Sequence, residues 1–424
     1  MRPNIHPSAR VDEARLWDRH EQMAAIGGFV NEQGHRGVNR AAFSAEDIGA
    51  RRLLIGWAKA RGWAIASDPI GNIFVRRPGR DPDAAPVLTG SHMDSQPRGG
   101  RFDGIYGVLA GLEALEAMDD AGVETQRPID LVAWSNEEGG RYQPGTMGSN
   151  TFVGGYDFEK MLATRDGDGI ELREALAETM TAMKDFAGDL QERPFNFPIA
   201  ACVEAHIEQG PRLESDNRTI GVVTGIQGIR WYLTKVFGRT DHAGTTPLRL
   251  RKDAVQATLR VIQGFNELMH DPDDVLRFTV ARMFVRPNAP SSVANEVEFT
   301  VDFRHPDSAV LKERGDKLPG LAAELAAPCT VEMNEMMNMA PTVFPDDLIN
   351  TVEAATRNLG HPYMHLPSGA FHDAGYIAKV APTTMIFIPC KRGVSHNEAE
   401  DATAADCAAG AQVLADTLVA LANR

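Results

Sequence analysis

An apolar strand, a helix and a second apolar strand follow one another between residues 86 and 134, and this order constrains the fold most. Residues 86–90 form the first apolar run, a helical pattern follows Asp103, and residues 129–134 form the second run. Two parallel strands joined by a crossover helix need helices on both faces of the sheet. We therefore expect an α/β domain whose mixed sheet is covered on both faces. Asp103 is expected at or near the N-cap, and the apolar face of the helix is expected to hold Ile105, Val108, Leu109, Leu112, Leu115 and Met118.

The pattern changes from about residue 220, where strands become longer and paired. The predicted elements are strands at 229–238, 275–285, 294–303 and 329–334 and helices at 252–270 and 308–326. Their order, β-α-β-β-α-β, is that of a ferredoxin-like α+β unit. The alternation of helices and strands seen in the first half returns afterwards, with a helix at 346–359 and a strand at 384–388. We therefore predict a catalytic domain made of residues 1–219 and 339–424, interrupted by a dimerisation or lid domain at 220–338.

Composition limits the cellular compartment and the kinds of binding partner that we expect. The net charge is −15, and no basic run or basic-aromatic patch stands out, so we expect neither nucleic acid nor membrane as a partner. No apolar run approaches the roughly 20 residues that span a bilayer, and the N-terminal segment lacks the apolar stretch of a secretory signal. The four cysteines are scattered without CxxC spacing, which indicates reduced thiols in a cytoplasmic protein.

Five short segments hold histidines and carboxylates: GSHMDS, GGRFDGIYG, WSNEEGG, EAHIEQG and GVSHNEAE. Each is weak alone, since a lone histidine is usually structural and a Glu-Glu pair is usually solvated. Together, three histidines and two carboxylates would make five ligands. If the aspartate, one of these two carboxylates, bridges two cations, each cation has three protein ligands. The remaining glutamate of the pair could then accept a proton from water. The residues are His92, Asp103, Glu137, Glu138, His206 and His396.

Placement and ligand type agree with a metal site. His92 and the two glutamates follow predicted strand ends, where open α/β sheets form their sites. Histidine and carboxylate without thiolate favour zinc, with manganese, cobalt or nickel as alternatives. Asp94, two residues after His92, is expected to accept the other imidazole proton and so fix the tautomer.

These segments resemble the M20 metallopeptidase-like amidohydrolases, and within them the hydantoinase/carbamoylase branch. The resemblance runs from about residue 15 to residue 415. It implies that Asp103 bridges two divalent metal ions per subunit, that His92 and His206 complete one, and that Glu138 and His396 complete the other. It also implies that Glu137 is the general base. A histidine at position 206, where peptidase relatives carry a carboxylate, favours the carbamoylase branch.

The resemblance also implies residues for the substrate. His242 would polarise the scissile carbonyl, often from the neighbouring subunit, and Arg304 would bind the substrate carboxylate. On composition alone, His242 is a polar turn residue and Arg304 an ordinary ion-pair partner. Further contacts are expected from Gln209, Gly369, Ala370 and His372.

Two positions depart from the family pattern, and both lie on the substrate side. Ser291 stands where members usually carry asparagine, and a hydroxyl cannot make the same two-sided contact as an amide. Phe371 stands where they usually carry glycine. Ser291 is still assigned to substrate binding, but the identity of the acyl or carbamoyl group stays open.

The resemblance thus implies a homodimeric dinuclear enzyme that cleaves a linear amide C–N bond in a small N-carbamoyl or ureido acid carrying a carboxylate. An N-acyl-amino acid deacylase or dipeptidase with the same metals is the nearest alternative. A catalytically silent binding protein of the same fold is the alternative of another class.

Overall fold

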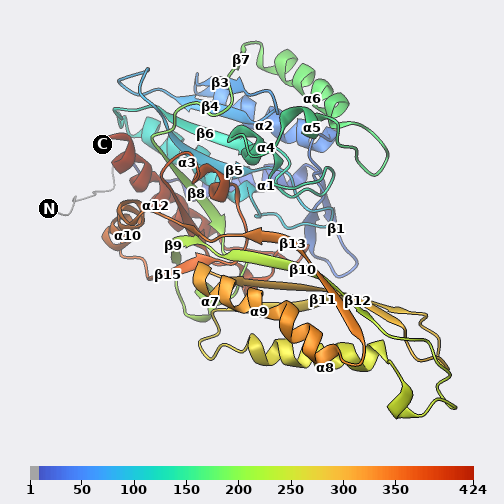
Figure 1. Ribbon diagram of the computed structural model, residues 1–424. Helices are drawn as coiled ribbons and strands as arrows, with labels where there is room; N and C mark the ends of the chain where they lie inside the picture. The colour runs from blue at the N-terminus through green and yellow to red at the C-terminus, as the bar shows by residue number, and fades with distance from the viewer. Residues whose placement is uncertain (1–8) are drawn as a thin grey trace. The chain divides into compact units, whose positions relative to one another are not determined.

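The computed structural model describes residues 9–424, which divide into two compact units (Figure 1). Unit 1 comprises Met1–Gly225 and Val343–Arg424, and unit 2 comprises Ile226–Thr342. The predicted domain boundaries lie a few residues before these limits, and the roles assigned to the domains remain predictions. The expectation of no secretory signal rests partly on residues 1–8, which lie outside the described residues.

Unit 1 is built on a 10-stranded sheet in the order β14-β9-β16-β8-β5-β6-β4-β3-β7, with β15 paired to β9. The four central strands, β16, β8, β5 and β6, are parallel. Their carboxyl ends therefore meet at one edge of the sheet. The strands are β3 (Ala64–Ser67), β4 (Ile73–Arg77), β5 (Val87–His92), β6 (Ile129–Trp134), β7 (Leu190–Glu192), β8 (Ala201–Ile207), β9 (Ile220–Ile226), β14 (Thr342–Val343), β15 (Tyr363–Ser368) and β16 (Thr383–Ile388).

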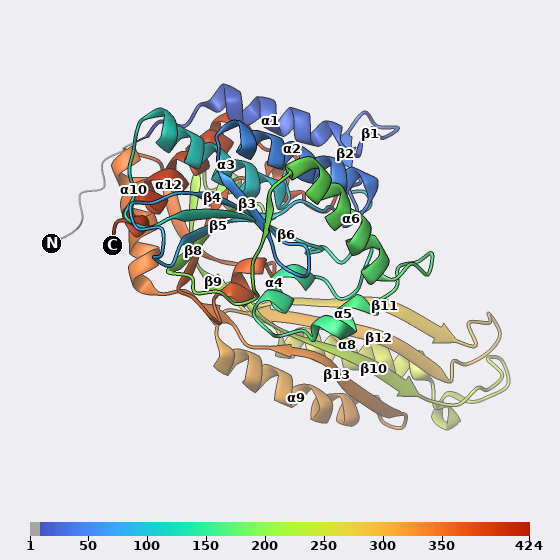
Figure 2. The same cartoon turned by 90° about the horizontal axis from the view of Figure 1, so that it is seen from above.

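Helices cover both faces of this sheet, as predicted. On one face, Gly111 of α3 lies against Leu131 and Thr89. On the other, Phe152 of α4 and Ile377 of α11 join Leu88 and Val132 in one apolar cluster, and Figure 2 shows α3 and α4 on either side of the strands. The helices are α1 (Glu13–Ala25), α2 (Ala45–Ala60), α3 (Ile105–Asp120), α4 (Met147–Phe152), α5 (Phe158–Leu162), α6 (Leu172–Ala187), α7 (Arg212–Ser215), α10 (Asp346–Leu359), α11 (Asp373–Ile377) and α12 (Ala404–Ala422), and a small hairpin pairs β1 (Gly28–Val30) with β2 (Arg36–Val38).

The helix α3 is more deeply buried than its pattern predicted. Its N-cap is Gly104, so Asp103 lies one residue before the N-cap, close to the predicted place. The six residues expected on the apolar face are buried, and so is every other residue of Ile105–Met118. The helices α1 and α12 pack on α3 as well, and Glu113 of α3 is buried in an ion pair with Arg15 of α1.

The last helix, α12, forms part of the core of unit 1. It is the one helix of the described chain that is long and apolar enough to cross a membrane, with a mean hydropathy of 1.3. Of that window, 61% is buried inside the structure, where α12 packs against α3, α10 and α1. This burial is that of a core helix.

Unit 2 has the predicted ferredoxin-like topology. Its sheet has the order β11-β12-β10-β13 with antiparallel neighbours. Both helices pack on the face that carries Tyr232, Val236 and Phe299, while Trp231 on the opposite face is 38% exposed. The elements are β10 (Gly228–Phe237), the 3₁₀ turn Leu248–Leu250, α8 (Ala254–Leu268), β11 (Arg277–Arg286), β12 (Glu296–His305), α9 (Ser308–Ala326) and β13 (Thr330–Met339), the last continuing past its predicted end at residue 334.

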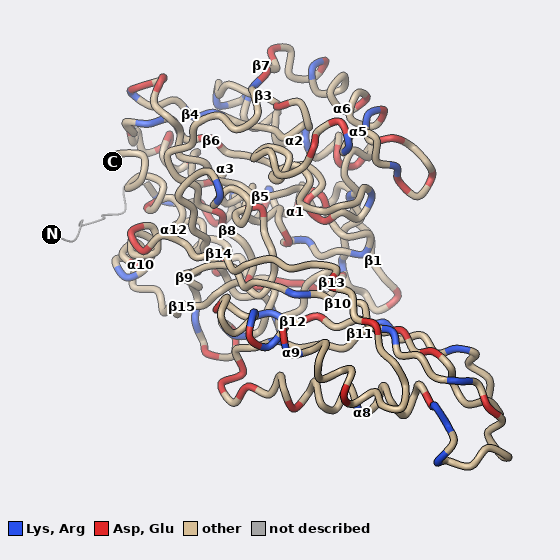
Figure 3. The backbone as a smooth tube through the Cα atoms, viewed as in Figure 1, with Lys and Arg blue, Asp and Glu red and all other residues tan. Residues whose placement is uncertain are grey.

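Acidic and basic residues are interspersed along both units rather than gathered in long stretches of one sign (Figure 3). The four cysteines are free and buried, in agreement with the prediction of reduced thiols.

Candidate metal centre

Four neighbouring parallel strands deliver the predicted ligands to one edge of the sheet. His92 is the last residue of β5 and His206 lies near the end of β8. The pair Glu137-Glu138 follows β6, and His396 follows β16. Because these strands are adjacent in the order β16-β8-β5-β6, segments about 300 residues apart in sequence meet in space.

Asp103 lies at the centre of the cluster. Its Oδ1 is 3.2 Å from His206 Nε2 and 3.9 Å from His92 Nε2. Its Oδ2 is 3.3 Å from His396 Nε2, and Glu138 Oε2 is 3.5 Å from the same nitrogen. The side chains thus form two groups of three that share Asp103, the first with His92 and His206 and the second with Glu138 and His396. All five predicted ligands are brought together in the predicted pairing.

The two buried histidines are oriented by backbone carbonyl groups. His92 Nδ1 lies 2.9 Å from the carbonyl oxygen of Asp94, and His206 Nδ1 lies 2.9 Å from that of Ile207. In the neutral ring, a proton held at Nδ1 leaves a lone pair on Nε2, which is the tautomer that a metal ligand needs. At His206 this Nε2 accepts the backbone N–H of Gly104 at 3.1 Å.

The predicted role of the Asp94 carboxylate was wrong. Its Oδ1 is 3.8 Å from His92 Nδ1, beyond hydrogen-bond distance, and the backbone carbonyl takes that place. The carboxylate instead accepts the backbone N–H groups of Glu137 and Glu138, at 3.1 Å and 3.2 Å. Asp94 therefore holds the two glutamates in place rather than the imidazole.

Glu137 lies beside both groups of three without belonging to either. Its Oε2 is 3.6 Å from His92 Nε2, and its side chain is 13% exposed. Burial, followed by the negative charges of Asp373 and Glu138, raises its pKa well above the usual value. A carboxylate with a raised pKa at the open side of such a cluster is suited to accept a proton.

The charges of the site fit divalent cations. Burial and the charge of Asp103 raise the pKa of Glu138 to about 8. Although burial opposes it, the hydrogen bond from His206 to Asp103 raises the pKa of His206 to about 9, and the same kind of bond raises that of His396 to about 9. Without metal, the negative charges of these carboxylates are offset by protons that the raised pKa values keep on Glu138, His206 and His396. Positive ions placed between them would replace those protons.

One buried side chain next to the cluster, Glu204, was missed from the sequence. Glu204 accepts hydrogen bonds from Ser91 Oγ at 2.6 Å and from the backbone N–H of Ala374 at 2.9 Å. It precedes His206 by two residues on β8 and so lies on the same face of the sheet, a spacing that could have identified it. It also forms a third possible ligand group with His206 and His372.

The segment after β15 was predicted to line the substrate pocket. His372 is buried, with its ring centroid 4.5 Å from that of His206 and its Nε2 2.9 Å from Ser368 Oγ. Ala370 accepts a hydrogen bond from the same hydroxyl, and Gly369 is exposed. His372 therefore lies against the ligand His206, and its contact with substrate, like those of Gly369 and Ala370, stays a prediction.

Four non-glycine residues with strained backbone lie in the segments of the site. Asn136, Thr146, Gln209 and His396 all have positive φ, between 49° and 54°. Such conformations persist in non-glycine residues only where surrounding contacts impose them, and they gather at functional sites. Gly104, with φ 65°, is required for a second reason, since a Cβ there would lie 2.3 Å from the His92 ring.

Gln209, predicted to contact substrate, donates from Nε2 to Asp103 Oδ2 at 2.9 Å. Its amide nitrogen also lies 3.4 Å from His396 Nε2. The side chain therefore faces the cluster, and contact with substrate stays a prediction.

His242 lies in unit 2, in an exposed turn. Its Nδ1 accepts the backbone N–H groups of Gly244 and Thr245, at 3.0 Å and 3.2 Å. In the neutral ring this fixes the proton on Nε2, so the exposed nitrogen is a donor. The turn pairs with the segment containing the exposed Ser291, through the backbone bond from Ala243 N to Ser291 O at 2.9 Å.

Arg304, also in unit 2, is half-buried on β12. Its guanidinium binds Asp302 through Nη2–Oδ2 at 3.0 Å and Nε–Oδ1 at 3.2 Å. This is the ion pair that composition alone suggested. A substrate carboxylate at this position would share the guanidinium with Asp302.

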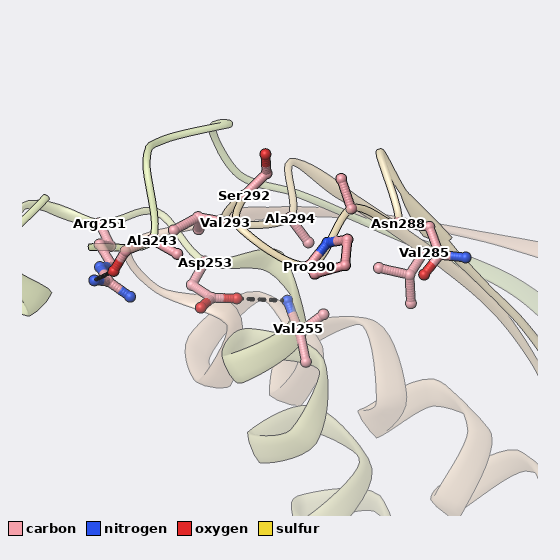
Figure 4. A pocket seen from close by; sticks show the side chains of 11 residues that line it. Ala243, Arg251, Asp253, Val255, Val285, Asn288, Pro290, Ser292, Val293 and Ala294 are labelled. Atoms are coloured by element: carbon pink, nitrogen blue, oxygen red, sulfur yellow. Dashed lines mark hydrogen bonds between the residues drawn. The ribbon is translucent and has the colours of Figure 1, made fainter. Parts of the chain in front are cut away.

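A cavity of about 340 Å³ lies beside the His242 turn within unit 2 (Figure 4). Asp253 on its wall accepts the backbone N–H of Val255 at 3.0 Å and so caps α8. Asn288 lines the opposite end, and Ser292 points away from the helix. The cavity holds none of the predicted metal ligands.

Taken together, parallel strands that end in a cluster of histidines and carboxylates define the class of metal-dependent α/β hydrolases. Comparison with known proteins agrees. The profile of peptidase family M20/M25/M40 matches residues 88–420, and the chain belongs to this family. The resemblance read from the five segments is thereby confirmed.

Individual relatives cover nearly the whole chain. An N-carbamoyl-L-amino-acid amidohydrolase of Rhizobium meliloti is 40% identical over 409 residues, 96% of this chain and 95% of that protein. An allantoate amidohydrolase of Bacillus subtilis is 31% identical, covering 91% and 93%. Among solved structures, an amidase of the hydantoinase/carbamoylase family from Burkholderia multivorans superposes with a TM-score of 0.91 at 43% identity, covering 99% of this chain and 100% of that one.

Proposed function

We propose that this chain is a dinuclear metal-dependent amidohydrolase that cleaves the carbamoyl C–N bond of an N-carbamoyl amino acid. The observation that carries the proposal is the position of Asp103 between two groups of three ligands, with Glu137 beside them. The substrate class is supported by the relatives named above, since the one from Rhizobium meliloti is 40% identical along nearly its full length.

His92, Asp103 and His206 would hold one cation, and Asp103, Glu138 and His396 the other. Zinc suits this nitrogen and oxygen set, and manganese, cobalt and nickel remain alternatives. Divalent cations at such a site supply Lewis-acid polarisation of a carbonyl group and lower the pKa of water.

Glu137 would act as general base and then as general acid. Its Oε2 would accept a proton from the attacking water and deliver it to the nitrogen that leaves the carbamoyl carbon. The adjacent backbone supports this role, because Asp94 holds the N–H of Glu137 and the N–H of Thr146 donates to the carbonyl oxygen of Glu137 at 2.6 Å. A base that is held by its own backbone can keep its carboxylate directed at the reacting atoms.

His242 and Arg304 would act on the substrate from the ferredoxin-like unit. His242 Nε2–H would donate to the carbonyl oxygen as negative charge develops there, a contribution worth about 3–4 kcal/mol in comparable sites. The support is its exposed position and the backbone bonds that fix its tautomer. Arg304 offers a planar fork suited to a carboxylate. Gln209, Gly369, Ala370, His372 and Ser291 complete the proposed substrate contacts.

A substrate panel tests the proposal. The metal-reconstituted protein is incubated with N-carbamoyl, ureido, N-formyl and N-acetyl amino acids, and both ammonia and free amine are measured. We expect one ammonia and one amino acid for each N-carbamoyl amino acid consumed, and little turnover of the N-acetyl compounds.

Amine without ammonia from N-acetyl substrates or dipeptides would instead identify a deacylase or dipeptidase with the same metals. No turnover of any compound by protein that retains both metals would indicate the silent binding protein. Allantoate, the substrate class in the name of the Bacillus subtilis relative, belongs in the same panel.

We also propose that unit 2 dimerises. Its strands β11 and β13 are sheet edges, the face away from the helices exposes Trp231 and Phe284, and Met283 and Met336 are exposed on the edge strands. Unpaired edges and apolar faces of this kind are normally covered by a partner. Sedimentation equilibrium should give the mass of two chains, and a fully active monomer would contradict both the dimer and action of His242 on a neighbouring subunit.

The buried free thiols support a cytoplasmic location, which stays part of the proposal.

A further inference from the structure

A buried carboxylate outside the ligand set connects the two segments that carry Asp103 and His396. Glu400 is only 2% exposed. Its Oε1 accepts the backbone N–H groups of Phe102 and Asp103, at 2.9 Å and 3.0 Å. Its Oε2 lies 3.0 Å from the hydroxyl of Ser395, the neighbour of His396. One side chain therefore binds two loops that are separated by nearly 300 residues in the sequence.

Ser395 extends this connection to the shared ligand itself. Its Oγ lies 3.1 Å from Asp103 Oδ2 as well as 3.0 Å from Glu400 Oε2. The hydroxyl has a single proton and can donate to only one of these oxygens at a time. Gln209 Nε2 donates to the same Oδ2 at 2.9 Å. Asp103 is thus fixed at its backbone by Glu400 and at its carboxylate by Ser395 and Gln209.

The second glycine of the pair before Asp103, Gly100, is explained by the same contact. A Cβ at Gly100 would lie 2.0 Å from the carboxyl carbon of Glu400. The loop can therefore close over Glu400 only because this position lacks a side chain. In the segment GGRFDG, Gly100 makes room for Glu400 and Gly104 makes room for the His92 ring.

We propose that Glu400 is a positioning residue that sets the spacing between Asp103 and His396. When two cations share one aspartate, its two oxygens must face two ligand groups at once. The distances between the ligand atoms must then be correct to within a few tenths of an ångström. The only one of the three histidines that is largely exposed is His396, at 53%, so its own packing constrains it least. The bonds from Glu400 supply that constraint. The inference rests on the ligand assignments of the proposed function.

The neighbouring Glu398 provides a matched control. It lies on the same segment, is less deeply buried at 9% exposure, and forms an ion pair with Arg98 rather than with the Asp103 loop. Glu398→Gln removes a carboxylate two residues from Glu400 and leaves the ligand loops bonded. Any effect of the lost charge alone should appear in both variants.

The test measures metal retention rather than turnover. Reconstituted wild type, Glu398→Gln, Glu400→Gln and Glu400→Ala are dialysed against graded concentrations of a chelator, and zinc per chain is determined by elemental analysis. Wild type and Glu398→Gln should hold two ions. Glu400→Ala should keep one and release the other at a chelator level roughly 10- to 100-fold lower, the usual cost of losing a group that orients a ligand.

Glu400→Gln guards against a failure of Glu400→Ala to fold. Its amide oxygen can still accept from the two backbone N–H groups, while its amide nitrogen replaces the acceptor that faces Ser395. Its second ion should be released between the levels of wild type and Glu400→Ala. Thermal unfolding of the metal-free proteins is recorded in parallel, and Glu400→Gln should unfold within a few degrees of wild type.

Two results would overturn the inference. The first is retention of both ions by Glu400→Gln and Glu400→Ala at the chelator levels of wild type. The second is equal loss of both ions together with a matching fall in the unfolding temperature of the metal-free protein, since this would show a merely structural role. If wild type itself holds fewer than two ions, the dinuclear assignment fails first, and the two failures are thereby distinguished.

Discussion

Replacing Glu137 by glutamine should abolish most turnover while leaving both metal ions bound. The variant keeps the shape of the side chain but cannot accept a proton, so kcat should fall roughly 1,000-fold, within the range that general acid–base catalysis contributes. Because Glu137 belongs to neither ligand group, zinc per chain should stay at the wild-type value. Steady-state kinetics with an N-carbamoyl amino acid and elemental analysis of the same sample check both parts.

The same chemical change at Glu124, an exposed residue paired with Arg80, is the control and should leave kcat unchanged. Turnover of Glu137→Gln within a few-fold of wild type would remove Glu137 from the role of base. Loss of metal along with activity would instead place Glu137 among the ligands, contrary to its position beside His92.

Asp103→Asn should have an even broader effect, because it removes the one carboxylate that both ligand groups share. Each oxygen of Asp103 faces one group, with His206 at 3.2 Å from Oδ1 and His396 at 3.3 Å from Oδ2. An amide offers one weak oxygen ligand and a nitrogen that cannot bind a cation. We expect the variant to retain at most one zinc per chain and to lose activity by more than roughly 1,000-fold.

Asp401→Asn serves as the matched control for this change. Asp401 lies one residue after Glu400, and its partly exposed carboxylate pairs with Lys391 at 3.1 Å and more distantly with Arg101 at 3.5 Å. Its loss removes one charge from the same segment without touching a ligand, so metal content and activity should both be preserved. Two zinc ions per chain in Asp103→Asn would show that the cations do not share this residue.

Local patterns predicted those parts of the fold that local chemistry determines. The strand Ile129–Trp134 and the helices Ser308–Ala326 and Asp346–Leu359 begin and end where their apolar runs and periodicity indicated. The βαβ and ferredoxin-like orders followed from such elements. By contrast, the burial of α3 on all sides depends on α1 and α12, which lie far away in the sequence.

The candidate site divides in the same way. The ligand residues could be predicted because each segment carries its own histidine or carboxylate next to a strand end or a glycine turn. The atoms that orient them could not, since the carbonyl rather than the carboxylate of Asp94 contacts His92, and Glu400 reaches the Asp103 loop from nearly 300 residues away. The positive φ of Gln209 and His396 likewise arises from tertiary contacts that no neighbouring residue indicates.

The departures at Ser291 and Phe371 concern the substrate and not the metals. Ser291 is exposed and contributes a backbone carbonyl to the His242 turn, while its hydroxyl offers one donor in place of an amide. Phe371 packs edge-on against Tyr376, with ring centroids 4.9 Å apart. Neither residue belongs to a ligand group, so the prediction of C–N bond hydrolysis does not depend on them, while the identity of the acyl or carbamoyl group does.

Anomalous diffraction from crystals of the zinc-reconstituted protein, recorded at the zinc absorption edge, tests the central claim most directly. The account predicts two peaks on either side of the Asp103 carboxylate, about 3.5 Å apart, one next to His92 and His206 and the other next to Glu138 and His396. A single peak, or two peaks that do not share Asp103, would contradict the dinuclear centre from which the proposed reaction follows.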